Sequence, residues 1–322
     1  MINVRALTGK IGSGAGFMQK LTASIALILM ILFFSLVSPY FLRLNNLLTI
    51  ALQTAITAIT AYGMIFVIIS AGVDLSIGSN IAFTGIMVAL MVKGDFPIVV
   101  AVMLCLLIGA VTGILNGVLI SKLKLPAFIA TLGMQMLLRG IALVATDARP
   151  VYMDNAPQFK LISQTRIFGQ VPIPVLYMAV LGIISAFLLR KTVVGRNVFA
   201  VGSNEESARL SGINTDRIRI FAFMYSGIMA AVAGIILTSR VNSGQPTIAV
   251  GYEANAIAAS VIGGASMRGG HGSISGAILG AFILGVLMNG LNLLNVSQNW
   301  QVFASGLVVI VAVYLDRLRS SQ

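Results

Sequence analysis

Two carboxylates in apolar surroundings are the first residues of chemical interest. Asp74 belongs to Gly72–Ser79, GVDLSIGS, where two glycines and two hydroxyls, one of them Ser76, interrupt an apolar run. Glu253 opens another apolar run in the sequence YEAN. An intramembrane carboxylate is costly and usually functional, whereas a carboxylate at a helix start stabilises the first turn. We expect an irregular turn at the membrane edge around Asp74. Helix capping is favoured for both residues, and a place on a transport pathway stays open.

The inventory of reactive side chains does not support an enzyme. The chain has one His and one Cys, and it lacks the G-x-x-x-x-G-K-[ST] phosphate loop. The glycine-rich stretch Gly12–Gly16, GSGAG, follows no predicted strand and lacks the full dinucleotide-binding pattern. We therefore expect no catalytic residue, no bound cofactor and no metal. If transport is driven by ATP, the ATPase must be another chain.

The longest polar interval between two membrane-length apolar runs is Gly195–Asn214. Within it, Ser203 and Glu206 have the spacing of a capping box, in which each side chain accepts a hydrogen bond from the other residue's backbone amide. Gly212 is placed to end the helix in a left-handed conformation. The sequence therefore predicts a short helix over about 203–212.

The charges of this short helix suit its dipole. Glu205 and Glu206 lie in the first turn and Arg209 lies near the end, where negative and positive charges respectively are favoured. Isolated helices of about two turns are marginal in water. The helix is therefore either seated on a partner surface or part of a solvated loop, and the pattern alone leaves both open.

The elements that carry these residues are membrane helices. Of 322 residues, 58% are hydrophobic and only 9% are charged, whereas soluble domains carry about 25% charged residues. The net charge of +12 is therefore read as membrane topology and not as a sign of nucleic-acid binding. The single Cys105 excludes a disulfide framework. We predict an all-α polytopic membrane protein in contact with lipid.

Apolar runs predict about ten transmembrane helices. They lie near 21–41, 48–70, 76–92, 97–120, 126–146, 172–189, 220–239, 253–265, 274–294 and 300–315. With the N-terminus inside, fourteen of the 21 Lys and Arg residues fall on the cytoplasmic side and six outside, which supports two cytoplasmic termini. The predicted organisation is a cytoplasmic tail (1–20), one transmembrane domain (21–316) and a C-terminal tail (317–322). The first run is read as a retained span and not a signal peptide.

The segment 147–171 is the longest loop predicted on the outer side. It is a candidate docking surface for an extracytoplasmic partner, and a solvated connector is an equally good interpretation.

Two predicted spans share a weak repeat. The small-residue series around Asn116 resembles that around Asn289, with one residue of slip between the two. The copies would run in opposite directions, as in the inverted repeats of transporters. Small-residue spacing also arises from ordinary helix packing. Interhelical hydrogen bonding and a pathway role therefore both stay open for the two asparagines.

Several motifs together resemble the permease subunits of ABC importers for monosaccharides, the ribose-transporter type, from about residue 45 to residue 316. Glu206-Ser207-Ala208, followed by three residues and Gly212, is similar to the E-A-A-x-x-x-G signature of importer permeases, although Ser207 replaces an alanine and the I-x-L-P continuation is missing. The stretch GVDLSIGS is similar to the G-I-D-L-S-V-G-S of the sugar branch. Further similar stretches are Leu125–Leu132, Gly251–Glu253 and Asn289–Asn292.

This resemblance implies an ATP-driven importer in the bacterial inner membrane. The resemblance implies a permease dimer of identical chains, an ABC ATPase partner that binds ATP and a periplasmic sugar-binding protein. The helix at 203–212 would be the coupling helix that contacts the ATPase. An ion- or proton-coupled secondary transporter is the alternative, and a membrane scaffold is a third interpretation.

Overall fold

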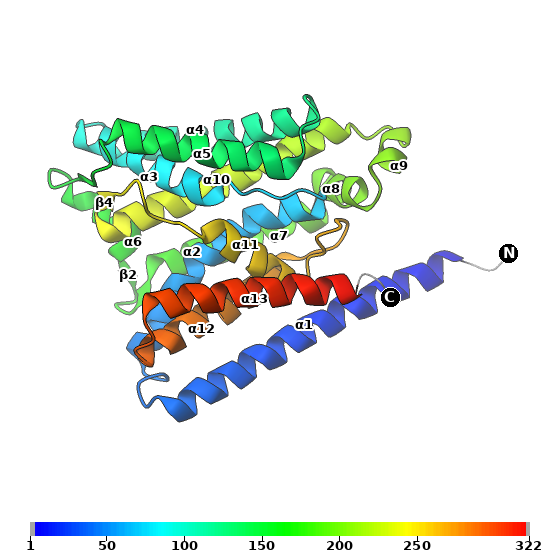
Figure 1. Cartoon of the computed structure of the whole chain (residues 1–322), viewed down its shortest axis with the longest axis horizontal. Helices are drawn as coiled ribbons and strands as arrows, with labels where there is room; N and C mark the ends of the chain where they lie inside the picture. The colour runs from blue at the N-terminus through cyan, green and yellow to red at the C-terminus, as the bar shows by residue number, and fades with distance from the viewer. Residues whose placement is uncertain (1–3, 320–322) are drawn as a thin grey trace.

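The structure, a computed structural model, describes the backbone of residues 4–319 and the side chains of residues 21–314. It is mostly helical (Figure 1). The long helices are α1 (Val4–Val37), α2 (Leu44–Ile69), α3 (Ile77–Lys93), α4 (Ile98–Ser121), α5 (Ala127–Ala145), α7 (Ile173–Lys191), α10 (Thr215–Val241), α12 (Ile274–Leu293) and α13 (Gln298–Arg319). The shorter helices are α6 (Leu161–Gln164), α8 (Val193–Ser203), α9 (Glu205–Leu210) and α11 (Tyr252–Ile262).

A helix lies over each of the ten apolar segments predicted to span the membrane. Six of them, α2, α4, α5, α7, α10 and α12, are long and apolar enough to cross a membrane by length and composition. The chain is therefore a multi-pass membrane protein. The segment predicted as an N-terminal tail is helical from Val4 onward and continuous with the first predicted span, because α1 runs to Val37.

Two helices begin inside the bundle and not at its surface. Helix α11 has only 11 residues, which is about 16 Å and too short to cross the apolar core. Figure 1 shows that the segments leading into α3 and α11 run back from opposite ends of the bundle toward its middle. The eighth predicted span is therefore a broken helix preceded by an extended segment.

Helices α2 and α10 form the centre of the bundle. Tyr62 and Phe66 on α2 are fully buried, and the ring centroids of Phe66 and Tyr225 lie 4.6 Å apart. Gly63 lets the backbone of α10 approach, because a Cβ there would lie 2.7 Å from the Cα of Ser226. Small residues that permit close backbone contact are common between membrane helices.

The glycines of the predicted repeat are also contact points between helices. A Cβ on Gly109 would meet Gly227 of α10, and a Cβ on Gly280 would meet the backbone of Ala259 on α11. Both small-residue series therefore permit close helix packing. The inverted repeat itself stays a prediction.

The predicted loop 147–171 has its own structure. It holds β1 (Val151–Tyr152), a 3-10 turn η1 (Pro157–Lys160), α6, β2 (Arg166–Ile167) and β3 (Val171–Pro172). Strand β1 pairs antiparallel with β4 (Ser243–Gly244), and β2 pairs with β3. Phe159 is fully buried, and its carbonyl accepts a hydrogen bond of 2.7 Å from Ser239 Oγ. The mostly helical fold thus also contains two short strand pairs, and this segment is a packed cap rather than a solvated connector.

The bundle has two distinct ends in Figure 1. Helices α8 and α9 lie at one, here called the α9 end, and β2 and β4 lie at the other, here called the β4 end. The described ends of α1 and α13, at Val4 and Arg319, both point toward the α9 end.

Candidate functional site

The predicted short helix is preceded by a second helix, α8, that the sequence interpretation missed. Thr192 Oγ1 accepts a hydrogen bond of 3.1 Å from the Gly195 amide and caps the start of α8. Gly195 and Gly202 lie within this helix, and because glycine is typical of loops, the sequence pattern indicated a loop here. Because α8 continues through Ser203, that hydroxyl donates back to the Phe199 carbonyl at 2.9 Å and is not free to cap α9.

Asn204 caps α9 in place of Ser203. Its side-chain oxygen accepts a hydrogen bond of 2.8 Å from the Ser207 amide. The capping box predicted between Ser203 and Glu206 is therefore wrong by one residue at its first position. The helix itself runs from Glu205 to Leu210, within the predicted interval.

The end of α9 follows the prediction made for Gly212. This glycine has φ +84°, in the left-handed region. The Gly212 amide donates to the Arg209 carbonyl at 3.0 Å, and the Ile213 amide donates to the Ala208 carbonyl at 3.1 Å. Ala208 is buried against the bundle, so α9 packs with one face inward.

The charged residues of α9 divide into paired and unpaired groups. Glu205 accepts from Arg219 of α10 at 2.8 Å and from Arg209 at 3.5 Å. Within the described residues the Glu206 carboxylate has no bonded partner, and Leu210 is 84% exposed. Glu206 and Leu210 are four residues apart and share one face of the helix. Helix α9 thus presents a carboxylate and an apolar side chain away from the bundle.

A tight glycine junction joins α8 to the end of α2. A Cβ on Gly202 would overlap the Ile69 carbonyl oxygen and lie 2.8 Å from the Gly270 amide nitrogen. That amide donates a hydrogen bond of 2.9 Å to the same Ile69 carbonyl. Gly269 has φ +87°, and a Cβ there would lie 2.9 Å from that of Ala71. The backbones of α8, the Gly269–Gly270 turn and the end of α2 are therefore in direct contact at this junction.

Asp74 lies beyond this junction, in the segment that leads from α2 back to α3. Its Oδ1 accepts from the Ser76 amide at 3.0 Å and the Ser76 hydroxyl at 2.6 Å. Its Oδ2 accepts from Ser226 Oγ at 2.7 Å. Ser226 lies about 16 Å along α10 from Thr215, at 1.5 Å per residue. Asp74 is 1% exposed, so it lies in the interior of the bundle and not at the predicted membrane edge.

The start of α3 is held by further polar contacts. Asn116 on α4 donates to Ser76 Oγ at 2.9 Å. Asn80 on α3 donates to Thr112 Oγ1 at 2.9 Å. The carbonyl oxygens of both asparagine side chains have no hydrogen-bond partner within the described residues. Asp74, Ser76 and Asn116, predicted separately, are thus brought together in one network.

Glu253 lies at the start of α11 and faces the start of α3. Its Oε1 accepts from the Gly251 amide at 3.3 Å, and a Cβ on Gly78 would overlap its Oε2. The starts of the two broken helices therefore abut inside the bundle. The positive ends of both helix dipoles meet there, which is favourable for the two carboxylates, Asp74 and Glu253.

Arg139 adds a positive charge to this junction. From α5 its Nη1 donates to the Pro246 carbonyl at 2.6 Å and the Ile248 carbonyl at 2.9 Å, and the guanidinium also attracts Glu253 electrostatically. It fixes the extended segment before α11. The sequence showed Arg139 within a span, but the long-range contact with these carbonyls left no local pattern.

Asn289 lies apart from these residues. Its side-chain amide forms a reciprocal pair with Asn46 at the start of α2, with both N–O distances 2.9 Å. The two asparagines of the predicted repeat therefore make different contacts, Asn116 with the start of α3 and Asn289 with the start of α2.

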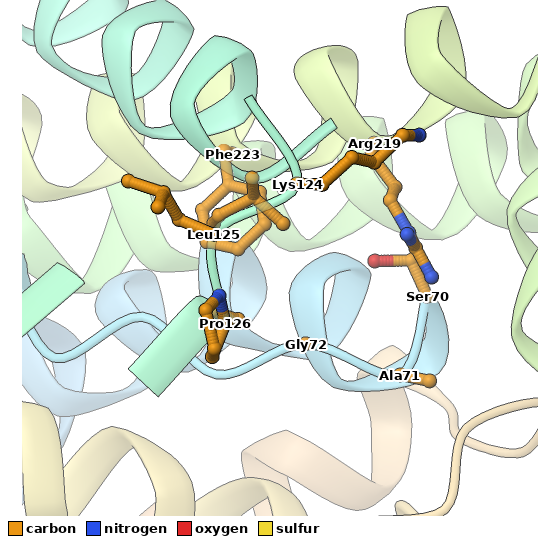
Figure 2. Close-up of a pocket in the computed structure, with 10 residues that line it drawn as sticks. Ser70, Ala71, Gly72, Lys124, Leu125, Pro126, Arg219 and Phe223 are labelled. Carbon is orange, nitrogen blue, oxygen red and sulfur yellow. The ribbon is translucent and has the colours of Figure 1, made fainter. Parts of the chain in front are cut away.

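A cavity of about 220 Å³ opens beside the end of α2 toward the α9 end. Figure 2 shows its wall formed by the Ser70–Gly72 segment, the Lys124–Pro126 connection and the side chains of Arg219 and Phe223. Arg219 is also the residue that binds Glu205 of α9. A movement of α9 can therefore reach the wall of this cavity directly through one ion pair.

Comparisons with known proteins find a family and several relatives that match most of the chain. The family model described as Branched-chain amino acid transport system / permease component matches residues 46–313. The chain is 44% identical over 303 residues to the ribose import permease protein RbsC of Haemophilus influenzae, covering 93% of this chain and 94% of the relative. It is 41% identical over 307 residues to RbsC of Bacillus subtilis, covering 95% of each chain.

Relatives with other names are also similar. The D-allose transport system permease protein AlsC of Escherichia coli is 37% identical over 300 residues, covering 93% of this chain and 91% of the relative. The matches extend across the broken helices, the glycine junction and α9. This chain therefore belongs to the Branched-chain amino acid transport system / permease component family of membrane transport proteins.

Proposed function

We propose that this chain is the permease subunit of an ATP-driven importer for a monosaccharide, ribose or a related sugar. The observation that carries the proposal is similarity over nearly the whole chain to permeases named for ribose, at 44% and 41% identity. Relatives named for D-allose and L-arabinose are 37% and 38% identical. The comparisons give no support to the ion- or proton-coupled alternative.

Helix α9 is the proposed contact with a separate ABC ATPase subunit. Its exposed face carries Glu206 and Leu210, and its opposite face is anchored through Ala208 and the Glu205–Arg219 ion pair. A short helix with a buried inner face and a free outer face suits transmission of force from a partner. The α9 end is then cytoplasmic, together with both termini.

The proposed path of force follows the contacts in order. ATP binding in the partner displaces α9 and α8, and the junction at Gly202 passes the movement to Ile69 at the end of α2. The segment 70–76 connects that point to Asp74 and the abutting starts of α3 and α11. We propose that this abutment, with Asp74, Ser76, Asn116 and Glu253 around it, is the barrier that separates the two sides of the membrane.

The assembly follows from the same proposal. Two permease copies, ten spans each, sit in the bacterial inner membrane with an inverted repeat in each copy. A sugar-binding protein delivers the sugar at the β4 end, where the packed cap 147–171 lies. The chain itself holds no nucleotide, because ATP is bound by the partner.

The test is ATP hydrolysis by the purified permease–ATPase complex in lipid. Hydrolysis is measured with and without the binding protein, and with ribose, allose and arabinose in turn. We expect stimulation only by binding protein that carries its sugar, which also names the substrate. An ATPase that does not associate with this chain, or hydrolysis indifferent to loaded binding protein, would contradict the proposal.

A further inference from the structure

A second cavity, here called the amide cavity, lies toward the β4 end between α2, α10, α11, α12 and α13. Its volume is about 390 Å³, within the range of small-molecule sites, about 300–1,000 Å³. Five of its lining residues carry side-chain amides: Gln53, Asn255, Asn292, Gln298 and Gln301. This concentration of amides is unusual for a chain with 58% hydrophobic residues.

The deeper amides have no bonded partner among the described residues. Gln53 and Asn255 are half-buried, and neither side chain forms a hydrogen bond within the described chain. Gln301 uses only its Nε2, which donates to the Val296 carbonyl at 2.9 Å. Donors and acceptors that line one half-open cavity and have no protein partner are free to bind a hydrogen-bonding ligand in place of water.

The chemistry of the lining suits a neutral polyhydroxylated molecule. Each amide offers both a donor and an acceptor, which matches a hydroxyl group that can do the same. Tyr252 adds a phenol and an aromatic surface, and Arg240 adds donors. Among the residues that the structure describes, no carboxylate lines the cavity, so a cation has no counter-charge from them.

The position of the cavity connects it to the helix junction. Tyr252 and Asn255 flank Glu253 in the first turn of α11, and Glu253 abuts Gly78 at the start of α3. The cavity beside Arg219 lies toward the opposite end of the bundle. The two cavities are therefore separated along the bundle by the abutting starts of α3 and α11.

We infer that the amide cavity is a transient binding site for the monosaccharide on the β4 side of the barrier, in which Gln53 and Asn255 bind its hydroxyl groups. This inference rests on the proposed function and assigns a site to it. The ligand class is a neutral pentose or hexose, and Gln53 and Asn255 are its specificity-determining residues.

The first experiment compares uptake with ATP consumption in proteoliposomes that contain the complete complex. The variants are Gln53→Leu and Asn255→Leu, and the matched control is Asn299→Leu, an exposed amide on α13 that does not line the cavity. We expect each lining variant to lower radiolabelled ribose uptake per ATP hydrolysed by about fivefold to tenfold, as loss of a hydrogen bond predicts. Hydrolysis stimulated by loaded binding protein should stay within about twofold of wild type for all three, because the contacts that reach the ATPase are intact.

The second experiment measures occupancy directly. The cysteine introduced by Asn255→Cys is labelled with a membrane-impermeant thiosulfonate in the complete complex, and the control is Asn299→Cys. Millimolar ribose should slow labelling at position 255 and leave position 299 unchanged, whereas betaine at equal osmolarity should affect neither. If a leucine variant fails to assemble, this labelling measurement still tests whether sugar binds in the amide cavity.

The outcomes separate the site from the function. Wild-type uptake without ATP or binding protein, or no wild-type uptake, would overturn the proposed function. Normal wild-type uptake with undiminished uptake in both lining variants, or labelling at 255 indifferent to ribose, would overturn the site alone. Equal losses of uptake and hydrolysis in the lining variants would also overturn it, because they would indicate a structural role.

Discussion

Glu205 and Arg219 form the shortest ion pair between α9 and the membrane helices, at 2.8 Å. Their side chains are 30% and 20% exposed respectively, and exposed or half-exposed pairs contribute only about 0–1 kcal/mol to stability. The pair is therefore a poor stabiliser but a direct mechanical link, since Arg219 also lines the cavity at the α9 end. Its effect should be seen in coupling.

Glu205→Gln should accordingly separate coupling from stability. We expect the free energy of unfolding to fall by less than about 1 kcal/mol, while hydrolysis stimulated by loaded binding protein falls severalfold. Asp216→Asn is the control, because Asp216 pairs with Lys122 at 3.0 Å and with Lys124, another residue of the same cavity wall, at 3.4 Å, but has no ion pair with α9 among the described residues. Equal effects of the two substitutions on stimulation would refute the link.

Gly212 is a second residue whose role is conformational. Nothing lies within 4 Å of a Cβ built there, but φ is +84°, so a β-branched residue is strained by its backbone alone, at about 1–2 kcal/mol or more. Gly212→Val should reduce stimulated hydrolysis more than it lowers the melting temperature, whereas Gly212→Asn should retain most of it, because Asn tolerates this conformation. Wild-type stimulation of ATP hydrolysis in the Gly212→Val variant would contradict a conformational role of Gly212 in coupling.

Glu206 tests the partner contact itself. Its carboxylate is exposed on the outer face of α9, so Glu206→Lys should leave the fold unchanged and weaken co-purification of the ATPase. The control is Asp154→Lys, which makes the same charge reversal at an exposed site of the β4 end. It should leave co-purification of the ATPase unchanged. Unchanged recovery of the ATPase with the Glu206 variant would count against α9 as the docking element.

At the scale of elements, the glycine junction brings the backbones of α8 and α2 into direct contact, and the proposed mechanism requires the two helices to move together. Gly202→Ala should be strongly destabilising, because its Cβ would overlap the Ile69 carbonyl, and overpacking costs about 1–3 kcal/mol. Gly306→Ala on α13 is the control, since nothing lies within 4 Å of a Cβ there. A thermal unfolding scan in detergent should show a lower melting temperature for the first variant only. Equal melting temperatures of the Gly202→Ala and Gly306→Ala variants would mean that the junction accommodates a methyl group without loss of stability.

The helices could be predicted from sequence because a membrane-length apolar run is a local property. Each predicted segment contains a helix. The position of Asp74 could not be predicted in this way. It depends on how the segment 70–76 folds back, which decides whether α3 begins at the surface or in the interior of the bundle. The hydrogen bond from Ser226 to Asp74 joins residues 152 apart in sequence, and no local pattern encodes it.

The end of α9 illustrates the same division. Gly212 signalled a left-handed residue through its own identity, and its φ confirmed that prediction. The cap failed because Ser203 and Asn204 are both good capping residues, and only the length of α8 decides between them. Arg139 and the amide cavity were missed because their partners come from separate helices.

At the scale of the whole molecule, two cavities lie along the proposed route of the sugar. The cavity beside Arg219 and the amide cavity lie on opposite sides of the abutting starts of α3 and α11. In the proposed mechanism, force from the ATPase reaches that barrier from α9 through α8 and the end of α2. A bundle with this arrangement can open one side while it closes the other, which is what an importer needs.

The most direct test of this account is accumulation of radiolabelled monosaccharide by proteoliposomes that enclose ATP, with loaded binding protein outside. We expect sugar to accumulate above its external concentration, and we expect omission of ATP, the ATPase or the binding protein to abolish accumulation. Accumulation that persists without ATP and follows an imposed proton gradient would contradict it, as would no accumulation by the complete system.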